Sequence, residues 1–129
     1  PDTYKMYETL CLNVKNSFDS TVDKFRSMGY DIIGYGAAAK GNTLLNFTGS
    51  KLDYIIDDNP LKHDYFAPGS QIKIVPISIL DCYTDDDKVL FIPLAWNFYK
   101  EIHTKIKSKR DNKNDRFFMY FPNPRVFED

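Results

Sequence analysis

The chain has 129 residues, a formal net charge of −1 and 43% hydrophobic residues, and it contains ten Phe and nine Tyr. This length suits a single domain with a real core, and the near balance of charge argues against a nucleic-acid-binding surface, which normally carries a basic excess. The longest apolar run, residues 89–96, is too short to span a bilayer. We therefore expect one domain over residues 1–129, in the cytoplasm, with no nucleic-acid or membrane partner.

The start of the chain and its cysteines set two further expectations. Pro1 leads directly into a helix-like pattern without a signal peptide, so we expect the chain to be part of a longer protein. Cys11 and Cys82 lie far apart in sequence, and neither has a metal-type spacing. This predicts two buried, reduced side chains and no metal site.

A long leading helix is the first predicted element. Apolar residues recur every three or four positions over residues 3–28, with a possible break near Asn16 and Ser17. The stripe extends to Met28, and Gly29 stands where helices usually end.

Short strands and helices alternate in the rest of the chain. In order, the pattern predicts strand 31–35, helix 40–48, strand 53–57, a turn-rich loop 58–69, strand 72–75, a short helix 76–80, strand 88–94, helix 95–110, a polar turn 111–115 and strand 117–121. In the last helix Phe98, Ile102 and Ile106 are predicted to face inward, and residues 105–110 to form a solvated basic end.

This alternation predicts an α/β fold. We expect a three-layer Rossmann-like domain with a mainly parallel five-stranded sheet and a long N-terminal helix. In such sheets ligands bind at the carboxyl ends of the strands, where the strand order reverses.

The glycine-rich turn GYGAAAKG, residues 34–41, is the strongest functional signal. Gly34 and Gly36 carry no Cβ, so the backbone can turn tightly and approach a ligand, and the next helix offers its amide N–H groups to an anion. The spacing from Gly34 to Ala39 fits the G-x-G-x-x-G/A dinucleotide fingerprint, with Asp57 about 20 residues further on. The sequence therefore predicts a phosphate-binding turn.

Two sets of polar residues are expected beside this turn. Lys40 can neutralise a phosphate, or it is an exposed lysine of the first helical turn. Asp57 can accept sugar hydroxyls at the end of its strand. Alternatively, Asp57, Asp58 and Asn59 form a turn that bonds its own backbone, and both interpretations stay open. Lys62 belongs to the same loop, which could close over a ligand.

A third candidate segment follows the apolar strand 88–94. Trp96 could stack on a base or pack on a sugar, and Asn97 could bond a ligand. The preferred interpretation is a core tryptophan followed by a helix-capping asparagine. The sequence contains no recognisable nucleophile motif, and the GxxxxGK[ST] phosphate loop is absent because Asn42 follows Gly41. We therefore expect binding without catalytic residues.

Three sequence blocks in a fixed order carry a resemblance to a known family. They are GYGAAAKGNTLLN, LDYIIDDNPLKHDYFAPGSQIKIVP and VLFIPLAWNFYKEI. Together they resemble the C-terminal domain of sugar-nucleotide C-methyltransferases, over about residues 31–106 and the preceding helix. In that family an N-terminal zinc-binding part and a central S-adenosylmethionine-binding domain precede a Rossmann-like domain that helps hold the nucleotide sugar.

The resemblance implies a substrate-binding role for this chain. It implies a C-terminal domain with a leading helix over residues 1–28, a missing upstream methyltransferase domain, and a dTDP- or UDP-linked sugar as partner. No cofactor is expected on this domain itself, and S-adenosylmethionine is implied for the full-length enzyme. The expected substrate-binding residues are Gly34, Gly36, Ala37, Ala38, Lys40, Gly41, Asp57, Asn59, Lys62, Trp96 and Asn97. Two alternatives are an NAD(P)- or S-adenosylmethionine-binding catalytic domain and a nonbinding structural module.

Overall fold

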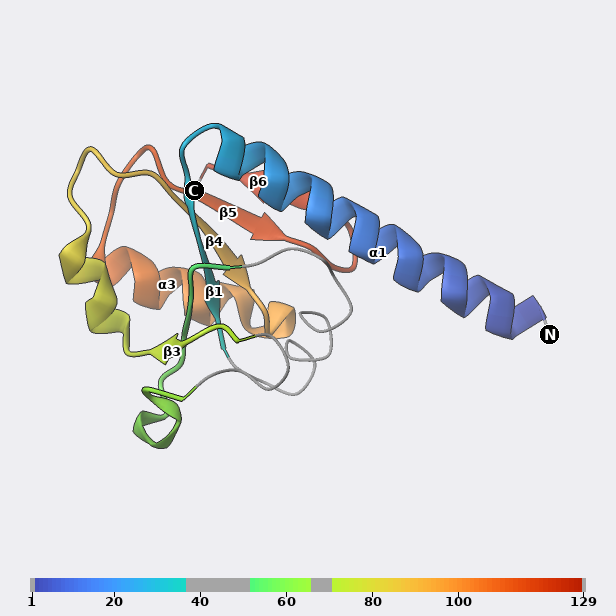
Figure 1. Cartoon of the computed structure of the whole chain (residues 1–129), viewed down its shortest axis with the longest axis horizontal. Coiled ribbons are helices and arrows are strands. Elements are labelled where there is room, and N and C mark those ends of the chain that lie inside the picture. Colours follow the sequence, from blue (N-terminus) through green and yellow to red (C-terminus); the bar gives the residue numbers. More distant parts are fainter. Residues whose placement is uncertain (1, 37–51, 66–70, 129) are drawn as a thin grey trace.

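The structure, a computed structural model, describes residues 2–36, 52–65 and 71–128. It is an α/β fold with a long N-terminal helix and a mostly parallel six-stranded sheet (Figure 1). The elements are α1 (Asp2–Ser27), β1 (Asp31–Tyr35), β2 (Tyr54–Ile56), the 3₁₀ turn η1 (Pro60–Lys62), β3 (Ile74–Val75), the 3₁₀ turn η2 (Ile77–Cys82), β4 (Val89–Pro93), the 3₁₀ turn η3 (Trp96–Phe98), α3 (Tyr99–Lys109), β5 (Arg116–Met119) and β6 (Arg125–Phe127).

The strand order of the sheet is β3-β2-β1-β4-β5-β6. β1 pairs in parallel with both β2 and β4, so the order reverses beside β1, as predicted. The predicted five strands are found, with bounds that differ by one or two residues, but β6 is a sixth strand that the sequence did not indicate. It pairs antiparallel with β5, at the edge of the sheet. Its three residues are mostly exposed, so they lack the apolar pattern that marks a buried strand.

The sheet buries a separate hydrophobic cluster on each face. On one face, Ile32 and Leu90 pack in the cluster of Phe18 and Val22 from α1. On the other, strand residues pack with α3 and η2, and Phe91 is fully buried there. Neighbouring strand residues point to opposite faces, and this is why consecutive apolar residues of β1 and β4 feed both clusters.

Helix α1 is continuous, without the possible break at Asn16 and Ser17. Phe18, Val22 and Phe25 are buried as the apolar stripe predicts. Its N-terminal half extends beyond the sheet (Figure 1). Within the described part of the chain, no helix is long and apolar enough to cross a membrane.

Two predicted burials near helix ends are wrong. Met28 is 43% exposed, because α1 ends at Ser27 and Gly29 follows with a φ of +88°. Phe98 is 54% exposed, because it lies in η3 and α3 starts only at Tyr99. Ile102 and Ile106 are buried as predicted.

The cysteine prediction also fails where it can be checked. Cys82 is exposed at the end of η2, whose buried residue is Leu80. The side chain of Cys11 and the helix predicted over residues 40–48 lie outside the described residues.

The predicted solvated end of the last helix is wrong for Arg110, which is buried. Its Nε donates a 2.8 Å hydrogen bond to Oδ2 of the buried Asp115. Its two Nη atoms donate to the carbonyl oxygens of Thr84 and Asp87, at 2.8 and 2.7 Å. Asp115 also accepts the N–H of Val89 at 3.0 Å, so one ion pair fixes the start of β4. A lysine lacks the planar, multi-donor head that this arrangement uses.

Candidate functional site

The carboxyl ends of β1, β2 and β4 meet at Gly36. Its N–H donates a 2.7 Å hydrogen bond to the carbonyl oxygen of Ile56, at the end of β2. A Cβ placed on Gly36 would lie 3.5 Å from the Cβ of Ala95, just after β4. The φ of Gly36 is +91°, a conformation that favours glycine. Gly36 therefore lies directly after β1, at the point where the strand order reverses.

Gly34 is a glycine for packing reasons. A Cβ there would lie 2.8 Å from Cδ1 of Leu52 and 3.0 Å from Cδ1 of Leu94. The first contact is shorter than those real Cβ atoms make and the second is tighter than most, so a larger residue at this position requires the Leu52 and Leu94 side chains to shift. Contact of Gly34 with a ligand stays a prediction.

Four predicted site residues lie outside the described residues: Ala37, Ala38, Lys40 and Gly41. Their roles stay predictions. The structure describes the strands on either side of these residues: β1 ends at Tyr35, and β2 begins at Tyr54.

The turn after β2 brings Asp57, Asn59 and Lys62 together. Oδ1 of Asp57 accepts the N–H of Asn59 at 2.8 Å, and Oδ1 of Asn59 accepts the N–H of Leu61 at 3.0 Å. Nζ of Lys62 lies 3.6 Å from Oδ2 of Asp57, and Nε2 of His63 lies 2.7 Å from the backbone carbonyl oxygen of Asp57. The turn interpretation of this segment is confirmed. Its contact with a sugar stays a prediction.

Asp58 was expected as part of this turn, but not among the substrate-binding residues. Its Oδ1 accepts a 2.5 Å hydrogen bond from the Tyr35 hydroxyl, and its Oδ2 accepts one from Nζ of Lys105 at 2.5 Å. Burial acts to raise the pKa of Asp58, but the hydrogen bonds from Lys105 and Tyr35 outweigh it and leave the pKa below its ordinary value. The sequence signal that could have indicated this contact is a tyrosine at the end of one buried strand and an Asp-Asp pair after the next strand.

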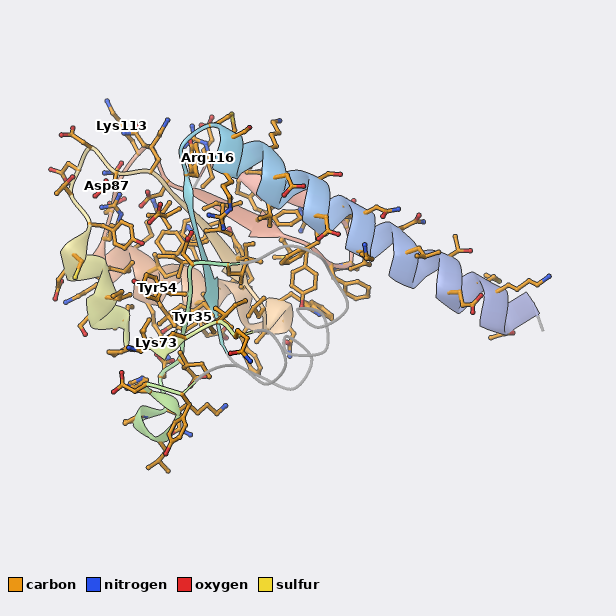
Figure 2. The ribbon with its side chains drawn as sticks, viewed as in Figure 1. Tyr35, Tyr54, Lys73, Asp87, Lys113 and Arg116 are labelled. Carbon is orange, nitrogen blue, oxygen red and sulfur yellow. The ribbon has the colours of Figure 1, made fainter. Side chains whose placement is uncertain are left out.

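Burial also raises the pKa of Tyr35, and the hydrogen bond to Asp58 raises it further. The hydroxyl therefore stays a donor at physiological pH. Tyr35 lies at the end of the sheet away from Asp87 and Lys113 (Figure 2). The Asp58 contacts and the Arg110–Asp115 pair thus belong to opposite edges.

Trp96 and Asn97 turn toward β5 and β6. The Trp96 ring is 5.0 Å from the ring of Phe121 and packs against the cluster on the α1 face, so the packing interpretation is confirmed. Asn97 is exposed and the predicted cap is wrong, because Ala95 and Phe98 hold the N-cap positions of η3 and α3. A single helix was predicted here, whereas the chain forms a 3₁₀ turn first.

Asn97 lines a hollow of about 380 Å³ beside the end of β5. The hollow also contains Lys100, Arg125 and the aromatic rings of Tyr99 and Phe127. The Arg125 guanidinium lies 5.0 Å from the centre of the Phe127 ring. Glu101 lines the hollow as well, and among the described residues Lys100 and Arg125 enter no ion pair, so the lining carries two cations and one carboxylate.

Tyr120 closes the edge at the end of β5 and gives a pH-dependent stability. Its hydroxyl donates a 2.6 Å hydrogen bond to the carbonyl oxygen of Leu94, and burial raises its pKa to about 12. The unfolded chain ionises first, near pH 10, so the stabilising contribution is complete below about pH 10 and disappears toward about pH 12. We expect Tyr120 to account for a loss on the order of 2 kcal/mol over this range.

Urea unfolding at neutral pH and between about pH 9.5 and 11.5 measures this loss. Tyr120→Phe is expected to show a shallower alkaline decline, together with a loss of about 1 kcal/mol at neutral pH for the hydrogen bond. Tyr65→Phe, at a hydroxyl-bearing residue that is 67% exposed, is the control and should behave as the unchanged chain does. An identical decline in all three proteins would show that Tyr120 is not involved.

The arrangement suits binding of an anion that also carries hydroxyl groups. Lys62, Asn59 and the Gly36 turn lie on one part of the edge, and Asn97, Lys100 and Arg125 on the next. Among the described residues, no group of three or more His, Cys, Asp or Glu side chains is placed to hold a metal ion.

Comparison with known families identifies the chain. Residues 1–122 match the family described as the C-methyltransferase C-terminal domain. The chain belongs to this family. A search of curated proteins found no match. The family match confirms the resemblance drawn from the three sequence blocks, and it extends through the leading helix and all of the candidate site residues.

Proposed function

We propose that this C-methyltransferase C-terminal domain holds the nucleotide-sugar substrate of a sugar C-methyltransferase, with the diphosphate at the turn of residues 34–41. The observation that carries the proposal is the meeting of β1, β2 and β4 at Gly36, which has a positive φ and lies where the strand order reverses. Open α/β sheets bind ligands at this point, because the strands on either side leave a crevice at their carboxyl ends. The strand order also supports a Rossmann-like layering.

The charges along the edge fit a ligand of this kind. Lys40 supplies a cation for the diphosphate, Lys62 balances the Asp57 carboxylate beside it, and Asn59 supplies an amide for hydroxyl groups. The hollow at Asn97 lies two strands away from β1, about 10 Å at the usual spacing of strands. A nucleoside diphosphate sugar is long enough to reach from the turn into this hollow.

In this proposal the domain holds the substrate and does not catalyse by itself. Methyl transfer belongs to the upstream methyltransferase domain, which binds S-adenosylmethionine. The complete enzyme works on deoxysugar precursors in the cytoplasm. The dTDP- and UDP-linked sugars are the expected substrates.

The geometry of Asp57 weighs against the NAD(P) alternative. In a dinucleotide site, the acidic residue at this strand end accepts the ribose hydroxyls. Here the Asp57 side chain is 11% exposed, its Oδ1 accepts the N–H of Asn59, and Lys62 lies beside its Oδ2. The alternative of a nonbinding structural module is supported by α1, because its outer part carries the exposed apolar residues Met6 and Leu12.

A calorimetric titration tests the proposal, with UDP, dTDP, UDP-glucose, dTDP-glucose, NAD and S-adenosylmethionine as separate ligands. We expect the nucleoside diphosphates and their sugars to bind. Lys40→Ala should lower their affinity by about tenfold, because it removes one charge-assisted contact. Lys113→Ala, an exposed lysine at the opposite edge, is the control and should leave binding unchanged. Binding of NAD or S-adenosylmethionine alone would overturn the proposal. Absence of any binding at millimolar ligand would favour the structural module.

A further inference from the structure

Asp58 is held by two donors from different elements. The Tyr35 hydroxyl, at the end of β1, reaches its Oδ1, and Nζ of Lys105, on α3, reaches its Oδ2. Tyr35 is 3% exposed, so its ring is fixed by the core beneath the edge. The carboxylate itself is about half exposed, as is the Lys105 head. It is therefore a charge at the surface, held in place from below.

This carboxylate lies beside the start of the glycine turn. Tyr35 directly precedes Gly36, and the N–H of Gly36 bonds to Ile56, two residues before Asp58. The ends of β1 and β2 thus bring the start of the proposed diphosphate turn close to two adjacent carboxylates, Asp57 and Asp58. An uncompensated carboxylate here would repel a diphosphate, because unit charges about 10 Å apart at a protein surface still interact.

Each of the two carboxylates has its own cation. Lys62 lies 3.6 Å from Asp57, and Lys105 lies 2.5 Å from Asp58. The Lys105–Asp58 pair is exposed on both sides, and exposed pairs add little to folding stability. Their consequence for the edge is electrostatic, because each removes a negative charge from the place where the proposed function puts an anion.

We propose that Lys105 and Tyr35 hold and neutralise the Asp58 carboxylate, so that the edge beside Gly36 can accept a diphosphate. Lys105 is then a positioning residue that acts through Asp58 and does not touch the ligand. This inference rests on the proposed function and adds to it a residue of α3, more than 40 positions away from Asp58 in the sequence.

The test is the affinity for inorganic pyrophosphate and for UDP, measured by calorimetry on single variants. Lys105→Met removes the cation and is expected to lower the affinity for both ligands by about threefold to tenfold. Asp58→Asn removes the negative charge while its amide oxygen still accepts from Tyr35, and it should bind as tightly as the unchanged chain or up to about threefold more tightly. The double variant should return to within about twofold of the unchanged chain, and Lys105→Arg should keep its affinity.

A second ion pair on α3 gives a matched control. Lys109 and Asp81 lie 3.0 Å apart at the opposite edge, so Lys109→Met and Asp81→Asn repeat the same charge changes at a distance. Neither should alter the affinity for pyrophosphate. Effects of the same sign in Lys105→Met and Asp58→Asn would overturn the inference and indicate a purely structural contact. Equal effects in the control pair, or no effect in either pair, would overturn it as well.

The two levels of the proposal fail in different ways. If the unchanged chain binds neither pyrophosphate nor UDP, the proposed function is wrong and this inference falls with it. If the unchanged chain binds both, but Lys105→Met does not weaken binding or Asp58→Asn does weaken it, only the role of Lys105 is wrong.

Discussion

Replacing Asp115 by Ala is expected to lower the free energy of unfolding by about 3–5 kcal/mol. The Arg110 and Asp115 side chains are 7% and 2% exposed, and they form two hydrogen bonds with each other. Removal of the carboxylate leaves a buried guanidinium without a counter-charge. It also leaves the N–H of Val89 without its acceptor at the start of β4. A buried charge that loses its partner costs far more than an exposed one.

Equilibrium unfolding in urea measures this change, with Asp111→Ala as the control. Asp111 also pairs with a lysine, Lys107, at 3.2 Å, but its side chain is 78% exposed. We expect its replacement to cost less than about 0.5 kcal/mol, because exposed pairs contribute little. A cost below about 1 kcal/mol for Asp115→Ala would mean that the buried pair does not fix β4.

Gly36→Ala is expected to weaken the binding of a nucleoside diphosphate by about tenfold or more. The reason is that the substitution shifts the atoms that bind the ligand by about 1 Å. The φ of Gly36 is +91°, and alanine there costs about 1–2 kcal/mol unless the backbone rotates. Rotation breaks the 2.7 Å hydrogen bond to Ile56 and moves the first residue of the turn. Space is not the obstacle, because the new Cβ would lie 3.5 Å from Ala95, an ordinary contact.

Gly29→Ala separates this effect from a loss of stability. Gly29 has a φ of +88°, it follows α1, and its nearest neighbour would lie 4.0 Å from a new Cβ. Both variants should lose a similar free energy of unfolding, but only Gly36→Ala should lose affinity. Equal affinities in the two variants would show that the turn at Gly36 does not contact the ligand.

The sequence predicted the framework of this fold well for a physical reason. The parallel strands are buried on both faces, so they read as continuous apolar runs, such as Val89–Pro93, that need no knowledge of their partners. The α1 stripe and the glycine that follows the helix, Gly29, are equally local signals, because they depend on residues within a few positions of each other. The positive φ of Gly36, directly after β1, belongs to the same class of local signal.

Features that depend on distant partners could not be predicted in this way. Arg110 reads as one more basic residue at a helix end, and only its contact with Asp115 and the loop before β4 makes it buried. Asp58 gains its importance from Lys105, far along the chain. Phe98 keeps the helical spacing of Ile102 but faces solvent, because a 3₁₀ turn changes the phase before α3.

The candidate site residues were predicted as two groups, and the structure agrees with the first group better than with the second. Asp57, Asn59 and Lys62 were expected together, and the turn after β2 brings them together. Trp96 and Asn97 were expected on the neighbouring edge, and they are there, but they face β5 and β6. The hollow at Asn97 was not predicted, because Arg125 comes from the sixth strand.

The most direct measurement of the central claim is a map of backbone amide chemical shifts in ¹⁵N-labelled protein during titration with UDP and dTDP. We predict the largest saturable shifts at Gly36, Asn59 and Asn97, along the carboxyl ends of the strands. Asp85 and Asn112, at the opposite edge, should move little. Shifts concentrated at that opposite edge or along α1, or no saturable shift at millimolar ligand, would contradict a nucleotide-sugar site at Gly36.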